Sequence, residues 1–156
     1  MIGGRLSRYR ADQGAAAVEA SITLSLLLLL IIGSVEFGRV SWTQHTMLLA
    51  VQEAGRFAMI SNVAAAPNCG AQSQARSCPA PSNTALANCS AARGRQVLSS
   101  YQATNIDVSV NENQTSTPGT LTVCASRSFD FAAPRLLPYG PLNMTSQLTV
   151  PLVEQR

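Results

Sequence analysis

The sequence predicts an α+β protein in which a long N-terminal membrane-spanning helix precedes a small domain with a second helix and a three-stranded antiparallel sheet. Two patterns predict this class. An uncharged apolar run leads into a helical periodicity, and three stretches of alternating apolar residues lie in the C-terminal half. A chain of 156 residues has room for one such helix and one modest core.

The apolar run from Ala20 to Val35 is the predicted membrane segment, because it contains no charged residue. As a helix it would span about 24 Å, which is less than the roughly 30 Å of a bilayer core. Starting the span at Ala15 supplies the missing length and includes Glu19. A charged group is costly inside a bilayer and usually has a partner, so we expect Glu19 near the membrane boundary.

Arg5, Arg8 and Arg10 precede the apolar run, so the positive-inside rule places the N-terminus in the cytoplasm. A secretory signal would end in a small-x-small cleavage site, but the sequence 32–34 begins with isoleucine. We therefore expect a single pass through the inner (cytoplasmic) membrane, with the C-terminal domain in the periplasm or outside the cell.

The helical pattern continues beyond the membrane, and we predict one helix over 15–60, about 69 Å long. One stripe of this helix stays apolar, and it contains Val40, Met47, Val51, Ala54 and Ala58. Glu36 with Arg39, and Glu53 with Arg56, are expected to form ion pairs three residues apart. The outer half should pack on its own domain, on neighbouring subunits, or on both.

Residues 61–156 should form the exported domain. Residues 61–83 are rich in Asn, Ala, Pro, Ser and Gln and predict a loop. A second helix is expected over 84–101, with Asn83 as its N-cap. Its expected inward side chains are Leu86, Val97 and Leu98.

Two alternating runs predict a hairpin around a turn at Pro118 and Gly119. The inward residues of these runs are Ile106, Val108 and Val110, then Leu121, Val123 and Ala125. A proline-containing connection over 132–141 leads to a third run, Leu148, Val150 and Leu152, in which Pro151 indicates an edge or a strand end.

The four cysteines all follow the apolar run, which favours two disulfides in an oxidising compartment over free thiols. They are Cys69, Cys78, Cys89 and Cys124. A zinc site is disfavoured because no pair has C-x-x-C spacing and the only histidine, His45, lies upstream. Three connectivities are open, of which we choose Cys69 to Cys78 and Cys89 to Cys124. Cys124 should point away from the apolar face of the hairpin, toward a covering helix or loop.

Charge and composition argue against several classes of function. The formal net charge is +3, and removal of residues 1–14 would leave 8 arginines against 7 acids, or +1, with no basic stripe for nucleic acid. Without lysine, and with isolated acids, no catalytic nucleophile with a base can be assembled, so we predict no enzyme and no cofactor. Asp107-Val-Ser109-Val-Asn111 resembles the start of a von Willebrand A metal site, but it has Asn where Ser is expected and lies in a predicted strand.

The segment Gly14-Ala15-Ala16-Ala17-Val18-Glu19, followed by the apolar run, resembles the processing site of type IV prepilins. The resemblance implies a peptidase cut after Gly14 at the cytoplasmic face, removal of residues 1–14, and Glu19 as the fifth residue of the mature chain. Glycine leaves the scissile backbone accessible, and a glutamate complements the dipole at a helix start. The alternative is a plain signal anchor with an incidental glutamate.

More narrowly, residues 14–58 resemble the TadE-like family, pseudopilins of tight-adherence (Flp) pilus systems. Besides the prepilin segment, Val35-Glu36-Phe37-Gly38-Arg39 and Glu53-Ala54-Gly55-Arg56-Phe57-Ala58 carry the resemblance. It implies a pilin-like fold and a minor or priming subunit whose partners are a prepilin peptidase, other pilins or pseudopilins, Tad inner-membrane assembly proteins and the lipid bilayer. The alternative function is a membrane-anchored scaffold that never enters the filament.

Overall fold

The computed structural model describes residues 3–61, 69–103, 105–115, 118–131 and 141–152, with side chains from residue 14 onward. Two helices, α1 (Gly3–Ile60) and α2 (Ala85–Ser100), precede three strands, β1 (Asp107–Asn113), β2 (Thr120–Phe129) and β3 (Leu142–Pro151). The predicted α+β class is thus confirmed. The chain divides into two units, Met1–Arg39 and Val40–Arg156.

Helix α1 begins at Gly3 and not near Ala15 as expected. Residues 3–14 contain no proline, and they include arginine, leucine, alanine and glutamine, which are strong helix formers. The helix therefore continues through the predicted leader. Its C-terminal part, from Val40 to Ile60, belongs to the second unit.

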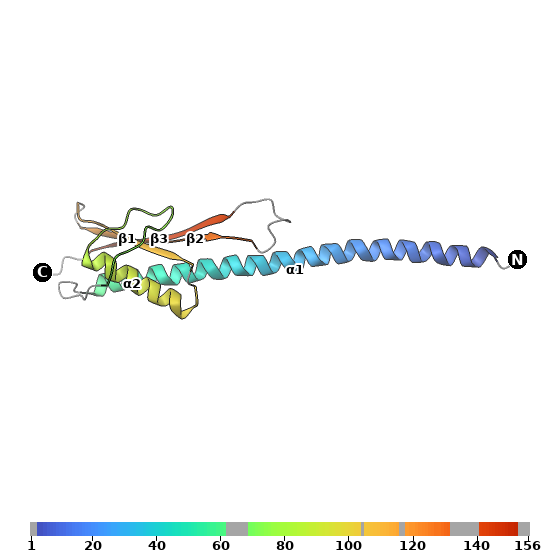
Figure 1. Ribbon diagram of the computed structural model, residues 1–156, viewed down its shortest axis with the longest axis horizontal. Helices are drawn as coiled ribbons and strands as arrows, with labels where there is room; N and C mark the ends of the chain where they lie inside the picture. The colour runs from blue at the N-terminus through green and yellow to red at the C-terminus, as the bar shows by residue number, and fades with distance from the viewer. Residues whose placement is uncertain (1–2, 62–68, 104, 116–117, 132–140, 153–156) are drawn as a thin grey trace. The chain divides into compact units, whose positions relative to one another are not determined.

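The three strands form one antiparallel sheet in the order β1-β2-β3. In Figure 1 the two helices lie on one side of this sheet within the second unit. The sheet side of the core is formed by Val108, Val110, Leu121, Val123, Ala125 and Val150, and the helix side by Met47, Ala50, Val51, Ala54, Ala58, Ala87, Ala91 and Leu98. These residues confirm both the alternating pattern of the strands and the packing of the outer part of α1 on its own domain. Complete burial of each valine or leucine contributes about 1.5 to 3 kcal/mol.

Helix α2 begins one residue later than predicted, with Thr84 and not Asn83 as its N-cap. The Thr84 hydroxyl accepts a hydrogen bond from the Ala87 N–H at 3.2 Å and donates one to a Glu112 carboxylate oxygen. Thr84 therefore caps the helix and links it to β1 at the same time. Leu98 is buried as expected, while Leu86 and Val97 are half-buried.

Our choice of disulfide pairing was wrong, because the structure joins Cys69 to Cys89 and Cys78 to Cys124. The segment after residue 69 does not close on itself as a short loop. It runs instead from α2 across the face of the sheet opposite the helices. Cys124 does point to that face, as its alternation with Val123 and Ala125 predicted, and the covering element is a loop.

The same loop covers the outer edge of β1. The Gln72 side chain accepts a hydrogen bond from the Val110 N–H at 2.6 Å, and the Val110 carbonyl accepts one from the Ser82 N–H at 3.0 Å. The Ser82 hydroxyl accepts a third bond, from the Glu112 N–H, at 2.8 Å. An exposed strand edge is a template for pairing with another chain, so these contacts protect the domain from edge-to-edge association.

We predict that Cys78→Ala combined with Cys124→Ala lowers the free energy of unfolding by about 2 to 4 kcal/mol, because the unfolded chain gains freedom and the loop loses its attachment to the sheet. Urea unfolding of the full chain in detergent, followed by tryptophan fluorescence, measures the loss.

As a control, a reducing agent should remove most of the difference between the variant and the unmodified chain. Non-reducing peptide mapping should recover Cys69 with Cys89. Recovery of a peptide that joins Cys69 to Cys78 would contradict the pairing in the structure.

Candidate processing and assembly site

The predicted membrane segment exposes every side chain from Gly14 through Val35 on α1. Within 14–60, α1 is long and apolar enough to cross a membrane, which fits a single-pass membrane protein. Exposed leucines are unfavourable in water and favourable among lipid chains. The exposure of this segment is therefore what a lipid environment requires.

The hydroxyl groups of the apolar segment are satisfied within α1 itself. Each of four hydroxyls donates a hydrogen bond to a carbonyl three or four residues earlier: Ser21 to Val18 at 2.7 Å, Thr23 to Glu19 at 3.0 Å, Ser25 to Ser21 at 2.7 Å and Ser34 to Ile31 at 2.9 Å. Such bonds leave no polar hydrogen unpaired when lipid surrounds the helix. The polar residues of the segment are thus compatible with a membrane.

Gly14, the predicted residue before the cut, lies within the continuous helix and has open space around it. A Cβ atom built on Gly14 would meet nothing within 4 Å. Glycine in a helix interior is about 0.8 to 1.0 kcal/mol less favourable than alanine. The backbone is therefore both accessible and easier to unwind at this position than at the alanines that follow.

Glu19 is the one ionisable residue between Gly14 and Val35. Its side chain is exposed, and it forms no ion pair with any other residue that the structure describes. A carboxylate in an apolar segment needs a compensating charge or water. In the described part of one chain Glu19 lacks that compensation.

Glu36 and Arg39 form the expected pair where the apolar segment ends. Arg39 Nη1 lies 3.0 and 3.2 Å from the two carboxylate oxygens of Glu36, and the Glu36 residue is 6% exposed. The pair thus partly neutralises a buried carboxylate.

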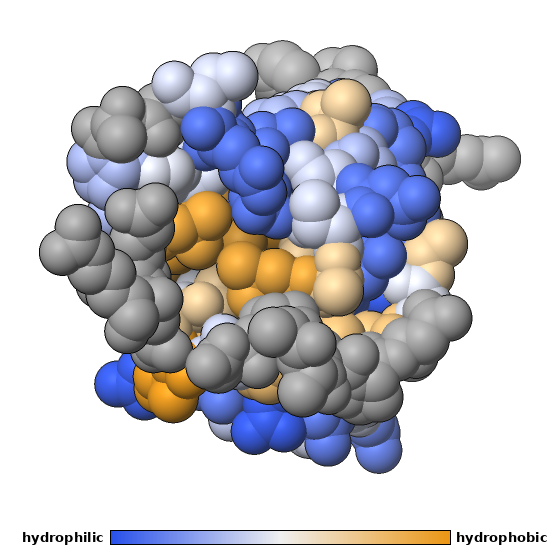
Figure 2. Space-filling view, turned by 90° about the vertical axis from the view of Figure 1, so that its left-hand side faces the viewer, coloured by the Kyte–Doolittle hydropathy of each residue, from blue (hydrophilic) through white to orange (hydrophobic). Residues whose placement is uncertain are grey.

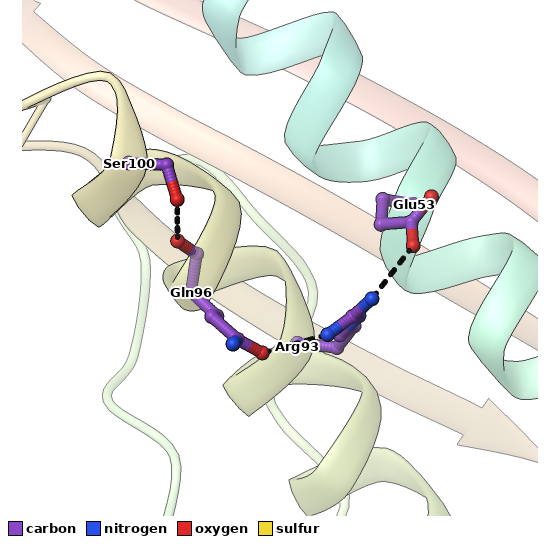
Figure 3. A network of polar contacts seen from close by, with 4 residues as sticks. All are labelled: Glu53, Arg93, Gln96 and Ser100. Carbon is purple, nitrogen blue, oxygen red and sulfur yellow. Dashed lines mark hydrogen bonds and ion pairs between the residues drawn. The ribbon is translucent and has the colours of Figure 1, made fainter.

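Glu53 pairs with Arg93 of α2 and not with Arg56 as predicted. Arg93 Nη2 lies 3.3 Å from Glu53 Oε1, and Arg93 Nη1 donates to Gln96 Oε1 at 2.8 Å, as Figure 3 shows. Arg56 is exposed on α1. Because α2 crosses beside Glu53, the tertiary partner replaces the local one.

Small residues allow close packing around this pair. A Cβ atom on Gly55 would lie 3.1 Å from Leu148 Cδ2 of β3. On α2, a Cβ atom on Gly94 would lie 3.3 Å from the Ala50 carbonyl oxygen. Ala54 is fully buried between these contacts. The residues Glu53-Ala54-Gly55 therefore hold α1 to α2 and to the sheet.

The remaining sequence candidates do not come together. Asp107, Ser109 and Asn111 lie along β1, as expected, and His45 is exposed on α1. Among the residues that the structure describes, no three His, Cys, Asp or Glu side chains gather as a metal site would require.

A shallow groove of about 220 Å³ lies between α1 and the start of β3, and it contains none of the predicted site residues. It is lined by Val40, Gln44, Met47, Leu142, Asn143, Met144 and Thr145.

Figure 2 shows another face of the molecule, where hydrophobic residues gather near the middle of a mostly hydrophilic surface. Met59 and Ile60, at the C-terminal end of α1, are 45% and 77% exposed.

The sequence did not predict several of the tertiary contacts. Gln72 and Ser82 protect the edge of β1, Arg93 pairs with Glu53, and Trp42 meets Tyr101 ring to ring. Helix α2 contains two arginines and no acidic residue, and this imbalance was the sequence signal that an arginine of α2 pairs with a carboxylate of another element. No local pattern marked the other contacts.

Comparison with known families supports the resemblance over part of the chain. The family model described as TadE-like protein matches residues 14–56. This match confirms the predicted TadE-like resemblance for that segment and connects the chain with Tad (Flp) pilus systems. No curated protein and no solved structure matches the chain.

We predict that Gly55→Leu lowers the free energy of unfolding by about 1 to 3 kcal/mol, because the larger side chain must displace Leu148. Gly38→Leu is the matched control, since it lies in the same helix and a Cβ atom there meets nothing within 4 Å. Both changes gain the same helix propensity, so their difference isolates the packing. Urea midpoints of the two variants in detergent measure it, and equal midpoints would contradict the close approach.

Proposed function

We propose that this protein is a minor pseudopilin that a prepilin peptidase cuts after Gly14 and that contributes to the assembly or priming of a Tad (Flp) type IV pilus. Ala15 then begins the mature chain. The apolar part of α1 anchors it in the inner membrane, and the disulfide-bonded domain stands in the periplasm or outside the cell.

The observation that carries this proposal is the family match at residues 14–56, which starts at Gly14 and leaves out the basic leader. The matched segment thus begins with the glycine before the cut and continues into the N-terminal part of the chain that would remain after cleavage. An exposed glycine in open space, followed by a helix with an apolar surface, is a suitable substrate for a peptidase at the membrane surface.

Glu19 supports a role in assembly. Cleavage would create a positively charged amine at Ala15, about one helical turn away, and the same amine on a neighbouring subunit could reach Glu19 when helices pack together. A carboxylate without a described partner in one chain would then be neutralised in the assembly. A plain membrane-anchored scaffold has no use for this charge.

The site of processing can be tested with Gly14→Ala. Alanine adds a side chain at the scissile bond and strengthens the helix there by roughly 1 kcal/mol, so we expect the uncut chain to accumulate in cells that contain the peptidase. Gly33→Ala is the matched control and should be processed normally, since its surroundings are equally open. Intact mass and N-terminal sequencing report the result, and a mature chain that begins anywhere but Ala15 would contradict the proposal.

The assembly role can be tested with Glu19→Gln, which keeps the shape of the side chain and removes its charge. Membrane insertion, processing and domain folding should be retained, while co-purification with other pilus components and the number of surface pili should fall. Asp107→Asn, which removes an exposed carboxylate of the domain, is the control and should retain both. If the Glu19→Gln chain assembles as well as the unmodified chain, the charge is incidental and the signal-anchor interpretation is favoured.

A further inference from the structure

Two aromatic rings from distant parts of the chain meet on the surface of the second unit. Trp42 of α1 and Tyr101, which follows α2, are in edge-to-face contact with ring centroids 6.4 Å apart and planes at 74°. Trp42 remains 60% exposed and Tyr101 46% exposed. The pair therefore presents a continuous aromatic surface outside the core.

The polar atoms of both rings are free for an outside partner. Within the part of the chain that the structure describes, neither the Trp42 indole N–H nor the Tyr101 hydroxyl forms a hydrogen bond. By contrast, Phe129 is 2% exposed and lies in the interior of the same unit. Rings with an apolar body and an unpaired polar tip are suited to a boundary between water and an apolar phase.

Trp42 lies where such a boundary is expected. The expected span from Ala15 to Val35 contains 21 residues, which is enough to cross the hydrocarbon core. Trp42 follows Val35 by seven residues, or roughly 10 Å along the helix. Side chains on a helix tilt toward its N-terminus, which brings the Trp42 ring back toward the core boundary. The headgroup layer is about 5 to 7 Å thick on each side of the core, and Trp and Tyr are enriched in it.

The neighbours of the pair in the sequence suit a phosphate-bearing surface. Ser41 and His45 flank Trp42, and Ser100 and Gln102 flank Tyr101. All four are exposed, and none of them is a carboxylate that would repel an anionic headgroup. The exposed pair thus has apolar bulk and hydrogen-bond donors, and its flanking residues carry no negative charge.

We propose that Trp42 and Tyr101 together form a membrane-surface contact that holds the exported domain on the outer headgroup layer of an anionic bilayer. Tyr101 is the residue through which the domain itself is held at the membrane, because it belongs to the domain and lies far along the chain from the membrane segment. The contact requires a membrane-anchored chain but neither cleavage after Gly14 nor entry into a pilus, so it can fail or hold independently of the proposed function.

Trp42 is the only tryptophan of the chain, which makes it a direct reporter. The full chain is reconstituted in vesicles of phosphatidylethanolamine and phosphatidylglycerol that contain lipids brominated either near the headgroup or near the chain end. Trp42 fluorescence should be quenched more strongly by the bromines near the headgroup. The exchanged variant, Trp42→Tyr with Tyr101→Trp, moves the reporter to the domain and should give the same order of quenching.

A third variant, Trp42→Tyr with Ile60→Trp, places the reporter at a position that is 77% exposed and about 27 Å farther along α1. This control should show no quenching by lipid and full quenching by aqueous iodide. Quenching by lipid at position 42 but not at position 101 would overturn the proposal, because only the helix would then touch the membrane. Equal lipid quenching at positions 42, 101 and 60 would overturn it as well, since the contact would not be specific.

A milder change keeps the proposal testable if the exchanged variant does not fold. Tyr101→Ser keeps the reporter at Trp42 and removes the ring of the domain, and its urea midpoint and disulfide map show whether the fold is retained. In a folded Tyr101→Ser chain the headgroup-level quenching of Trp42 should fall and iodide quenching should rise. Unchanged quenching of both kinds would overturn the proposal.

Discussion

The packing of α1 against the three-stranded sheet is the interaction on which the rest of the domain depends. One continuous helix has to suit two surroundings, because its side chains are exposed from Gly14 through Val35 while Met47 is fully buried. Small residues allow the buried part of the helix to pack closely against its neighbours. Ala50, Ala54 and Gly55 let α2 and β3 approach the helix closely, which large side chains at these positions would prevent.

The small sheet sets a second constraint, since three strands have two faces and two edges to cover. The helices bury one face, and the loop after Cys69 covers the other face and the outer edge of β1. Such a loop contributes few apolar contacts of its own, so covalent attachment at Cys69 and Cys78 supplies much of its order. The disulfides therefore stabilise the element that shields β1 from other chains.

The glutamates of α1 show how charge is distributed between these surroundings. Glu36 is paired with Arg39 and Glu53 with Arg93, whereas Glu19 has no ion-pair partner in the described residues. The two paired carboxylates lie where the chain itself supplies an arginine. Glu19 lies in the apolar segment, where a partner outside the described residues or water can compensate it. This difference is the physical basis of the proposed intermolecular role of Glu19.

The sequence by itself determined the features that depend on local periodicity and on the order of residues. These include the long helix, the inward residues of the strands, the hairpin of β1 and β2, the direction of Cys124 and the TadE-like segment. Only the tertiary structure decided the disulfide pairing, the partner of Glu53, the protection of β1 by Gln72 and the meeting of Trp42 with Tyr101. Each of these joins segments that are distant in the chain, and their contacts depend on how the helices cross and where the loop runs, which the periodicity of a single segment does not record.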